Sequence, residues 1–280
     1  MRITTFIFVI YDKMTKDKED FFMNNILFII ATASLSLSMY MHAAMFPQQL
    51  TITEPTSDEL LLINAAHQYS DEPQNLTRIP YDLANNVHVS QDFHVNASLI
   101  TPLQQMFHAA AQDDVQHFTI NRAYRSTASQ QKLYTTYGAG HALPPMFSEH
   151  ETGLSLDIGS TVGLMENAAE GKWLAEHAAS FGFVVRYPAH KTDITGIKFE
   201  PWHLRYVGLP HSKIMAQNDF VLEEYIPFLR KQELYEIELD GVHYVVQYTT
   251  ESTLNIPDTT RYTISETNEG GYVVTSIVNK

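Results

Sequence analysis

The run from Ile26 to Phe46 limits how this chain can fold more than any other feature, because its 21 residues include no Asp, Glu, Lys or Arg. A helix of about 20 apolar residues is long enough to cross a bilayer. Three lysines lie between residues 13 and 18, and basic residues favour the cytoplasmic side. Residues 1–46 are therefore expected to be a membrane anchor or, alternatively, a signal peptide that is cleaved. Both alternatives place the rest of the chain outside the cytoplasmic membrane.

The charge and the lack of cysteine exclude several classes of protein. The chain carries 32 Asp and Glu against 18 Lys and Arg, a net charge of −14 at pH 7. A protein that binds phosphate backbones has the opposite balance, so nucleic acid is not an expected partner. Without cysteine there are no disulfides, no thiolate metal ligands and no cysteine nucleophile. Any bound metal must therefore be held by His, Asp or Glu.

The exported part divides into three segments. Residues 47–58 are polar and contain two prolines, as is typical of a linker. Residues 59–231 contain most of the helix and strand patterns and are expected to form the main domain. In residues 232–280, alternating apolar residues flank the dipeptide Asp240-Gly241, which is typical of a two-residue hairpin. This last segment is expected to be a small all-β module.

The main domain is expected to mix helices and strands. Helices are predicted after Pro102, after Ser126 and from about residue 168, and Gly138 is a good end for the second of them. Residues 67–96, rich in Asn, Asp, Gln and Pro, are expected to be mostly loop. The second helix is expected to have an apolar face of Leu133, Tyr134 and Tyr137. Strands are expected at residues 117–121, 154–158, 183–185 and 197–203.

Two segments supply a set of residues suited to a metal. His150 lies in a polar stretch, and Asp157 follows the apolar residues 154–156. A carboxylate at the end of a buried run needs a partner, and a metal would be one, although a turn-capping Asp is the alternative. His203 adds a second imidazole, and two imidazoles with one carboxylate suit zinc with a fourth position left for water. Nearby Glu200 could then act as a general base or, alternatively, form a surface ion pair.

A third segment, Tyr124–Ser126, places Arg125 between a strand and a helix. A guanidinium held there could stabilise an oxyanion or bind a terminal carboxylate through two hydrogen bonds. A structural salt bridge is the alternative.

With these three segments together, the chain resembles the VanY-type D,D-carboxypeptidases of the D-Ala-D-Ala zinc metallopeptidase family. The family pattern is Y-R-S, then S-x-H-x-x-G-x-x-x-D, then E-x-W-H. It stands here intact and in order as residues 124–126, 148–157 and 200–203. The resemblance covers roughly residues 60–280. It implies an α+β fold of the hedgehog/D,D-peptidase type, with helices packed on an antiparallel sheet.

The resemblance also implies a function and a role for each site residue. One Zn²⁺ per chain is expected, held by His150, Asp157 and His203. Glu200 is expected to be the base that assists attack by a zinc-bound water, and Arg125 to stabilise the tetrahedral intermediate. Ser148 and Gln130 fall where the family contacts the D-alanine end of the substrate. The expected substrates are peptidoglycan stem pentapeptides, or their lipid-linked precursors, ending in D-Ala-D-Ala.

Three other functions remain open at this stage. A D,D-dipeptidase is the weakest of them, since such enzymes tend to be cytoplasmic and lack an export segment. An L,D-carboxypeptidase acting on tetrapeptides could use the same metal site, because the difference lies in loops. A wall-binding domain that has lost catalysis could keep the same fold. Relatives of VanY type contribute to glycopeptide resistance by trimming D-Ala-D-Ala ends, and others serve wall maturation.

Overall fold

The computed structural model describes residues 44–69, 71–139 and 141–278. The expected N-terminal segment at residues 1–46 lies outside the described residues except for its last three. Within the described ranges, no helix is both long and apolar enough to cross a membrane. The described residues divide into two compact units, one that ends at Thr51 and includes Thr253–Thr260, and one of Ile52–Ser252 with the residues that follow from Arg261. In the first unit, strands β1 (Gln48–Thr51) and β11 (Thr253–Ile256) pair antiparallel.

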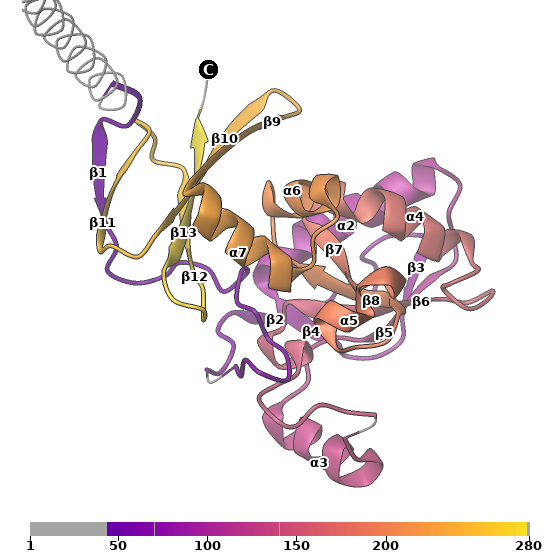
Figure 1. The fold of residues 1–280 in the computed structure, drawn as a ribbon. Coiled ribbons are helices and arrows are strands. Elements are labelled where there is room, and N and C mark those ends of the chain that lie inside the picture. The colour runs from indigo at the N-terminus through magenta and orange to yellow at the C-terminus, as the bar shows by residue number, and fades with distance from the viewer. Residues whose placement is uncertain (1–43, 70, 140, 279–280) are drawn as a thin grey trace, which may run out of the picture. The chain divides into compact units, whose positions relative to one another are not determined.

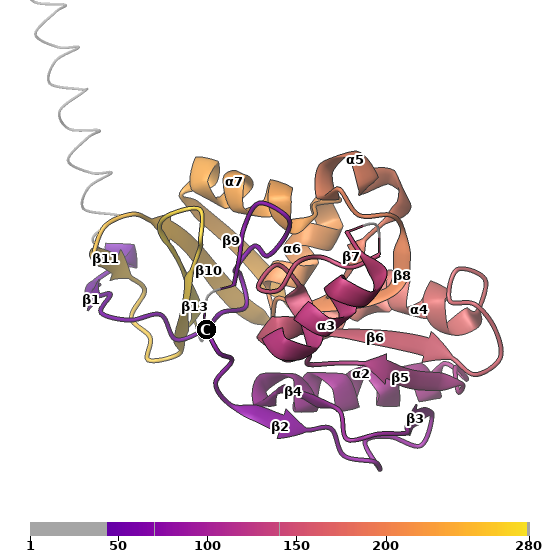
Figure 2. The same cartoon turned by 90° about the horizontal axis from the view of Figure 1, so that it is seen from below.

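The second unit contains a five-stranded sheet in the order β3-β5-β6-β8-β7. Its pairs are antiparallel except for β3 and β5, which are parallel, so the expected antiparallel sheet is mixed at one edge. Strands β5 and β6 run side by side across the lower part of Figure 2. The strands are β3 (Val87–Val89), β5 (Phe118–Arg122), β6 (Ser155–Ser160), β7 (Phe183–Tyr187) and β8 (Glu200–Tyr206).

Two helices pack on this sheet because each has one apolar face (Figure 1). Helix α2 (Ile100–Gln112) buries Leu103, Met106, Phe107 and Ala110 on one face. Helix α4 (Ala169–His177) buries Trp173 and Leu174. Both faces join one core with sheet residues such as Leu156, Ile158 and Leu204.

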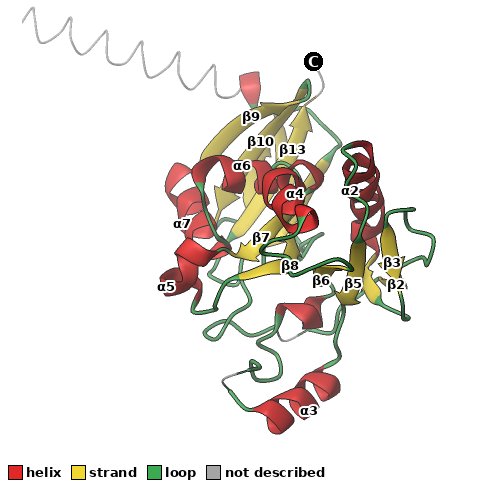
Figure 3. Ribbon diagram, turned by 90° about the vertical axis from the view of Figure 1, so that its right-hand side faces the viewer, coloured by secondary structure: helices red, strands yellow, loops and turns green. Residues whose placement is uncertain are grey.

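Helix α3 (Thr127–Tyr137) begins and ends where the sequence predicted. The Ser126 hydroxyl accepts a hydrogen bond from the Ser129 amide, and Gly138 ends the helix at φ 75°. The prediction of an apolar face made by Leu133, Tyr134 and Tyr137 is wrong. Tyr137 is 61% exposed, and Gln130 is the buried residue of this helix. Figure 3 shows α3 standing away from the five-stranded sheet, so it has little apolar surface to cover.

The expected hairpin at Asp240-Gly241 is confirmed, with both residues at positive φ. It joins two strands of a four-stranded antiparallel sheet in the order β12-β13-β10-β9. Apolar residues of α7 (Leu222–Gln232) share a core with Val246 and Val273 of this sheet. The boundary predicted at residue 231 stays a prediction. The strands are β9 (Leu234–Leu239), β10 (Val242–Thr249), β12 (Tyr262–Glu266) and β13 (Tyr272–Val278).

The segment expected to be mostly loop contains three short strands. Besides β3, strands β2 (Leu76–Arg78) and β4 (His94–Asn96) form an antiparallel pair. Each has only three residues, too few for alternation to be recognised in a sequence. The remaining helices are η1 (Ala97–Leu99), η2 (Glu149–Thr152), η3 (Ala178–Phe181), η4 (Ala189–Lys191), α5 (Thr192–Thr195) and α6 (His211–Asn218).

Candidate active site

The structure brings His150, Asp157 and His203 together in the second unit. His150 lies on the short 3₁₀ helix η2, which leads into β6. Asp157 on β6 and His203 on β8 are directly opposite each other in the antiparallel pair. All three side chains are buried, and one ligand atom from each lies within 4.8 Å of the others. The turn at η2 and the pairing of β6 with β8 therefore bring the three predicted ligands together.

The distances among these atoms suit a tetrahedral metal. His150 Nε2 is 3.4 Å and His203 Nδ1 is 3.1 Å from the same Asp157 oxygen, Oδ1. Zinc bonds of about 2.0–2.1 Å at tetrahedral angles put neighbouring ligand atoms about 3.3 Å apart. The donor set, two imidazole nitrogens and one carboxylate oxygen, is also of the type that zinc prefers. The residues present thus fit a zinc ion.

The far nitrogen of each imidazole has its own partner. His150 Nδ1 lies 2.9 Å from the Ala123 carbonyl, so it donates there and leaves the Nε2 lone pair free for a metal. His203 is turned the other way, with Nε2 3.2 Å from Glu149 Oε2 and Nδ1 facing Asp157. Burial lowers the pKa of His150. Burial also disfavours the charged form of His203, but Asp157 and Glu149 raise its pKa to about 9.

Asp157 is held as an anion. Burial alone would raise its pKa, but the neighbouring imidazoles of His150 and His203 hold the pKa far below its ordinary value. Its second oxygen, Oδ2, accepts from Arg122 Nη1 at 3.1 Å. Arg122 was not predicted from the sequence. It reaches Asp157 because a bulge in β5 shifts the register between Ile120 and Arg122.

Glu200 reaches the same side of the sheet as His203 because β8 is irregular. In a regular strand, residues three apart point to opposite faces. Here Tyr187 of β7 pairs with Glu200 and Val185 pairs with Leu204, so three β8 residues lie opposite one residue of β7. Glu200 Oε2 comes within 3.9 Å of His203 Nδ1, and the Glu200 side chain keeps 30% exposure. Burial raises the pKa of Glu200.

Arg125 follows β5 and precedes α3, as predicted. Its amide donates to the His150 carbonyl at 3.0 Å, which ties it to η2. Its Nη1 donates to Gln130 Oε1 at 2.7 Å, and Gln130 Nε2 donates to the Leu143 carbonyl at 2.6 Å. Both polar ends of Gln130 are therefore engaged within the chain. The neighbouring Gln131 is exposed and bonds to Thr135 of its own helix.

Ser148 is the N-cap of η2, two residues before His150, and is nearly buried. Glu151 fixes this turn, since its Oε2 accepts from the amides of Met146 at 2.8 Å and Ser148 at 3.3 Å. These hydrogen bonds fix the backbone that carries Ser148, two residues before the predicted ligand His150.

Comparisons with known proteins point to one group of enzymes. The VanY family model, described as D-alanyl-D-alanine carboxypeptidase, matches residues 92–209. A D-alanyl-D-alanine carboxypeptidase of Enterococcus faecium is 40% identical over 238 residues, which cover 81% of this chain and 78% of the relative. The structure of the vancomycin resistance D,D-dipeptidase VanXYg with a D-Ala-D-Ala phosphinate analog has a TM-score of 0.71 and 28% identity, covering 82% of this chain and 98% of that one. A mutant of the D,D-pentapeptidase VanY from a VanB-type resistance cassette, in complex with Zn(II), has a TM-score of 0.51 and 28% identity, covering 61% of this chain and 99% of that one.

Proposed function

Because the chain belongs to the VanY family of D-alanyl-D-alanine carboxypeptidases, we propose that it uses one zinc ion to release the terminal D-alanine from peptidoglycan stem pentapeptides. The α+β fold of the hedgehog/D,D-peptidase type, expected from the sequence, is confirmed by the likeness to VanXYg and VanY. The observation that carries the proposal is the convergence of His150, Asp157 and His203 within 4.8 Å, with the carboxylate of Glu200 beside them.

His150, Asp157 and His203 hold the metal, and Glu200 transfers a proton from the attacking water to the departing amine. Zinc bound there supplies Lewis acidity, which polarises a carbonyl and lowers the pKa of a water toward ~7. Glu200 accepts a proton from the attacking water and delivers it to the departing amine. Its partial burial favours this role, because a carboxylate with a raised pKa is a stronger base and accepts a proton more readily. Its remaining exposure leaves it open to substrate.

Arg125 stabilises the negative charge that develops on the scissile carbonyl oxygen. A guanidinium fixed in advance costs no reorganisation during the reaction. The side chain of Gln130 accepts a hydrogen bond from Arg125 and donates one to the Leu143 carbonyl. We therefore propose that Gln130 positions the Arg125 guanidinium, in addition to making the expected substrate contact. Ser148, on the turn before His150, is proposed to contact the D-alanine end.

Alanine release from synthetic stem peptides tests the proposal. A pentapeptide ending in D-Ala-D-Ala and the matching tetrapeptide are compared, each with and without a zinc chelator. We expect release from the pentapeptide that stops with chelator and returns with zinc. Release from the tetrapeptide alone would indicate an L,D-carboxypeptidase. No release from either peptide by the folded, zinc-loaded protein would indicate a domain without catalysis.

We also propose that residues 26–46 keep the enzyme outside the cytoplasmic membrane, where wall peptides are found. The support is the uncharged apolar run and the lysines before it. Fractionation of cells that produce the full chain checks this. The chain is expected with the membranes if the segment is an anchor, or in the medium if it is cleaved, and recovery from the cytosol would refute both.

A further inference from the structure

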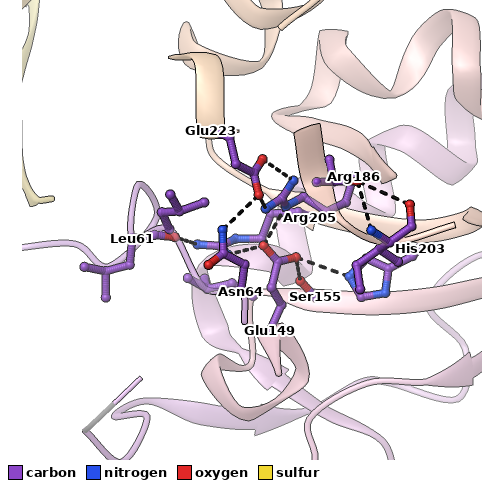
Figure 4. Close-up of polar contacts among 12 residues, drawn as sticks. Leu61, Asn64, Glu149, Ser155, Arg186, His203, Arg205 and Glu223 are labelled. Atoms are coloured by element: carbon purple, nitrogen blue, oxygen red, sulfur yellow. Dashed lines mark hydrogen bonds and ion pairs between the residues drawn. The ribbon is translucent and has the colours of Figure 1, made fainter. Parts of the chain in front are cut away.

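A buried glutamate lies behind His203, on the side away from Asp157. Glu149 Oε2 is 3.2 Å from His203 Nε2, and the glutamate side chain is completely buried (Figure 4). The same oxygen accepts from the Ser155 hydroxyl at 3.0 Å. A carboxylate without access to water must be matched by charge or hydrogen bonds, so its position is set by its surroundings.

Two buried arginines hold the other oxygen of Glu149. Arg186 Nε donates to Oε1 at 2.8 Å, and Arg205 Nη1 donates to it at 3.0 Å. Both arginine side chains are inaccessible to solvent. Glu149 is therefore an anion fixed at both oxygens.

The arginines are fixed in turn by groups farther from the site. Arg186 uses Nη1 and Nη2 for a two-pronged pair with Glu223, at 2.8 and 2.7 Å. Glu223 Oε1 also accepts from Asn64 Nδ2 at 3.1 Å. Arg205 Nη2 donates to the carbonyls of Glu59 at 3.1 Å and Leu61 at 3.0 Å (Figure 4). The cluster thus runs from helix α7 and the segment 59–64 to the far nitrogen of His203.

Stability alone does not account for such a cluster. Removing charges from water is costly, and apolar residues of similar volume often stabilise a core as well or better. The arginines lie in strands that also bury apolar residues, including Phe183 and Leu204. What the cluster provides is one fixed acceptor, aimed at one nitrogen of His203.

We propose that Glu149 is a positioning residue that directs Nδ1 of His203 to the metal, an inference that rests on the zinc function proposed above. Asp157 Oδ1 lies only 3.1 Å from Nδ1 and would otherwise compete for a proton on that atom. Because Glu149 accepts a hydrogen bond from Nε2, the single proton of the metal-bound ring stays on Nε2 and the Nδ1 lone pair is directed toward the metal. A carboxylate behind a metal-bound histidine also makes the ring a stronger donor. His150 has the neutral counterpart, the Ala123 carbonyl.

The substitution Glu149→Gln tests this role because it keeps the size of the side chain and removes the charge. Zinc affinity is measured on the full chain by competition with a chelating dye. We expect the variant to bind zinc about 10–100-fold more weakly than the wild type. Glu170→Gln is the matched control, since Glu170 is also buried but accepts from the His117 amide, and its zinc affinity is expected to be unchanged. Thermal unfolding of both metal-free variants shows whether they fold.

Imidazole ¹⁵N NMR of the zinc-loaded wild type gives a second readout that does not depend on any variant folding. We expect His203 to bind through Nδ1 and to carry a slowly exchanging proton on Nε2. Binding through Nε2, or wild-type affinity in a folded Glu149→Gln variant, would overturn the inference. Failure of the wild type to bind zinc would instead refute the function proposed above.

Discussion

Arg186→Met is the substitution whose effect on stability follows most directly from the structure. Arg186 is completely buried and makes three charged hydrogen bonds of 2.7–2.8 Å, one to Glu149 and two to Glu223. Methionine has a similar volume but cannot donate hydrogen bonds. In the variant, Glu149 keeps its ion pair with Arg205, and Glu223 keeps its hydrogen bond from Asn64. Breaking a buried pair by removing one partner costs about 3–5 kcal/mol, because the other charge stays buried. We expect the free energy of unfolding to fall by about this amount.

The assay is unfolding of the metal-free protein by urea and by heat, followed by circular dichroism. For a domain of this size, each kcal/mol shifts the midpoint by about 2–4 °C, so we expect a drop of about 6–20 °C. Arg78→Met is the matched control. Arg78 pairs with Asp92 at 3.4 Å, but both side chains are largely exposed, and such pairs add little to stability. A change in Arg186→Met no larger than in Arg78→Met would refute the reasoning about the buried cluster.

Three further predictions concern catalysis, packing and pH. Glu200→Gln is expected to lower the rate of D-alanine release about 10²–10⁴-fold while zinc content is retained, and a normal rate would remove Glu200 as the base. Gly171→Ala is expected to cost about 1–3 kcal/mol in urea unfolding, because a Cβ there would lie 1.8 Å from the Met165 carbonyl oxygen, whereas Gly163→Ala has open space and should change little. Burial lowers the pKa of His211 to about 3. Below pH ~6.5 the unfolded chain therefore binds a proton at this histidine that the folded chain does not bind. As a result, the free energy of unfolding falls by up to about 1.4 kcal/mol for each pH unit below ~6.5. His211→Gln should therefore show a shallower loss of stability than the wild type between pH 7 and 5, and an equal slope would contradict this.

The features that the sequence predicted well are set by local rules. Ser126 and Gly138 define α3 because a capping hydroxyl and a glycine at positive φ act on adjacent backbone. The hairpin at Asp240-Gly241 follows from the same kind of rule. His150 and Asp157 also come together locally, because the motif around His150 leads directly into the strand that carries Asp157, whereas His203 joins them through the pairing of β6 with β8.

Other features of the site depend on pairing between distant segments, which local rules do not determine. The alternation rule alone would separate Glu200 from His203, and only the irregular pairing of β7 with β8 brings them to one side. Glu149 is adjacent to His150, yet its role depends on arginines 37 and 56 residues away. One signal was available in the sequence, since an arginine within an apolar strand, such as Arg186, requires a buried anion as partner.

The central claim is that one zinc ion is held by His150, Asp157 and His203, and zinc anomalous scattering from a crystal of the zinc-loaded chain tests it most directly. We expect one strong peak at about 2.0–2.2 Å from His150 Nε2, Asp157 Oδ1 and His203 Nδ1. A zinc peak elsewhere, with none among these three atoms, would contradict the account.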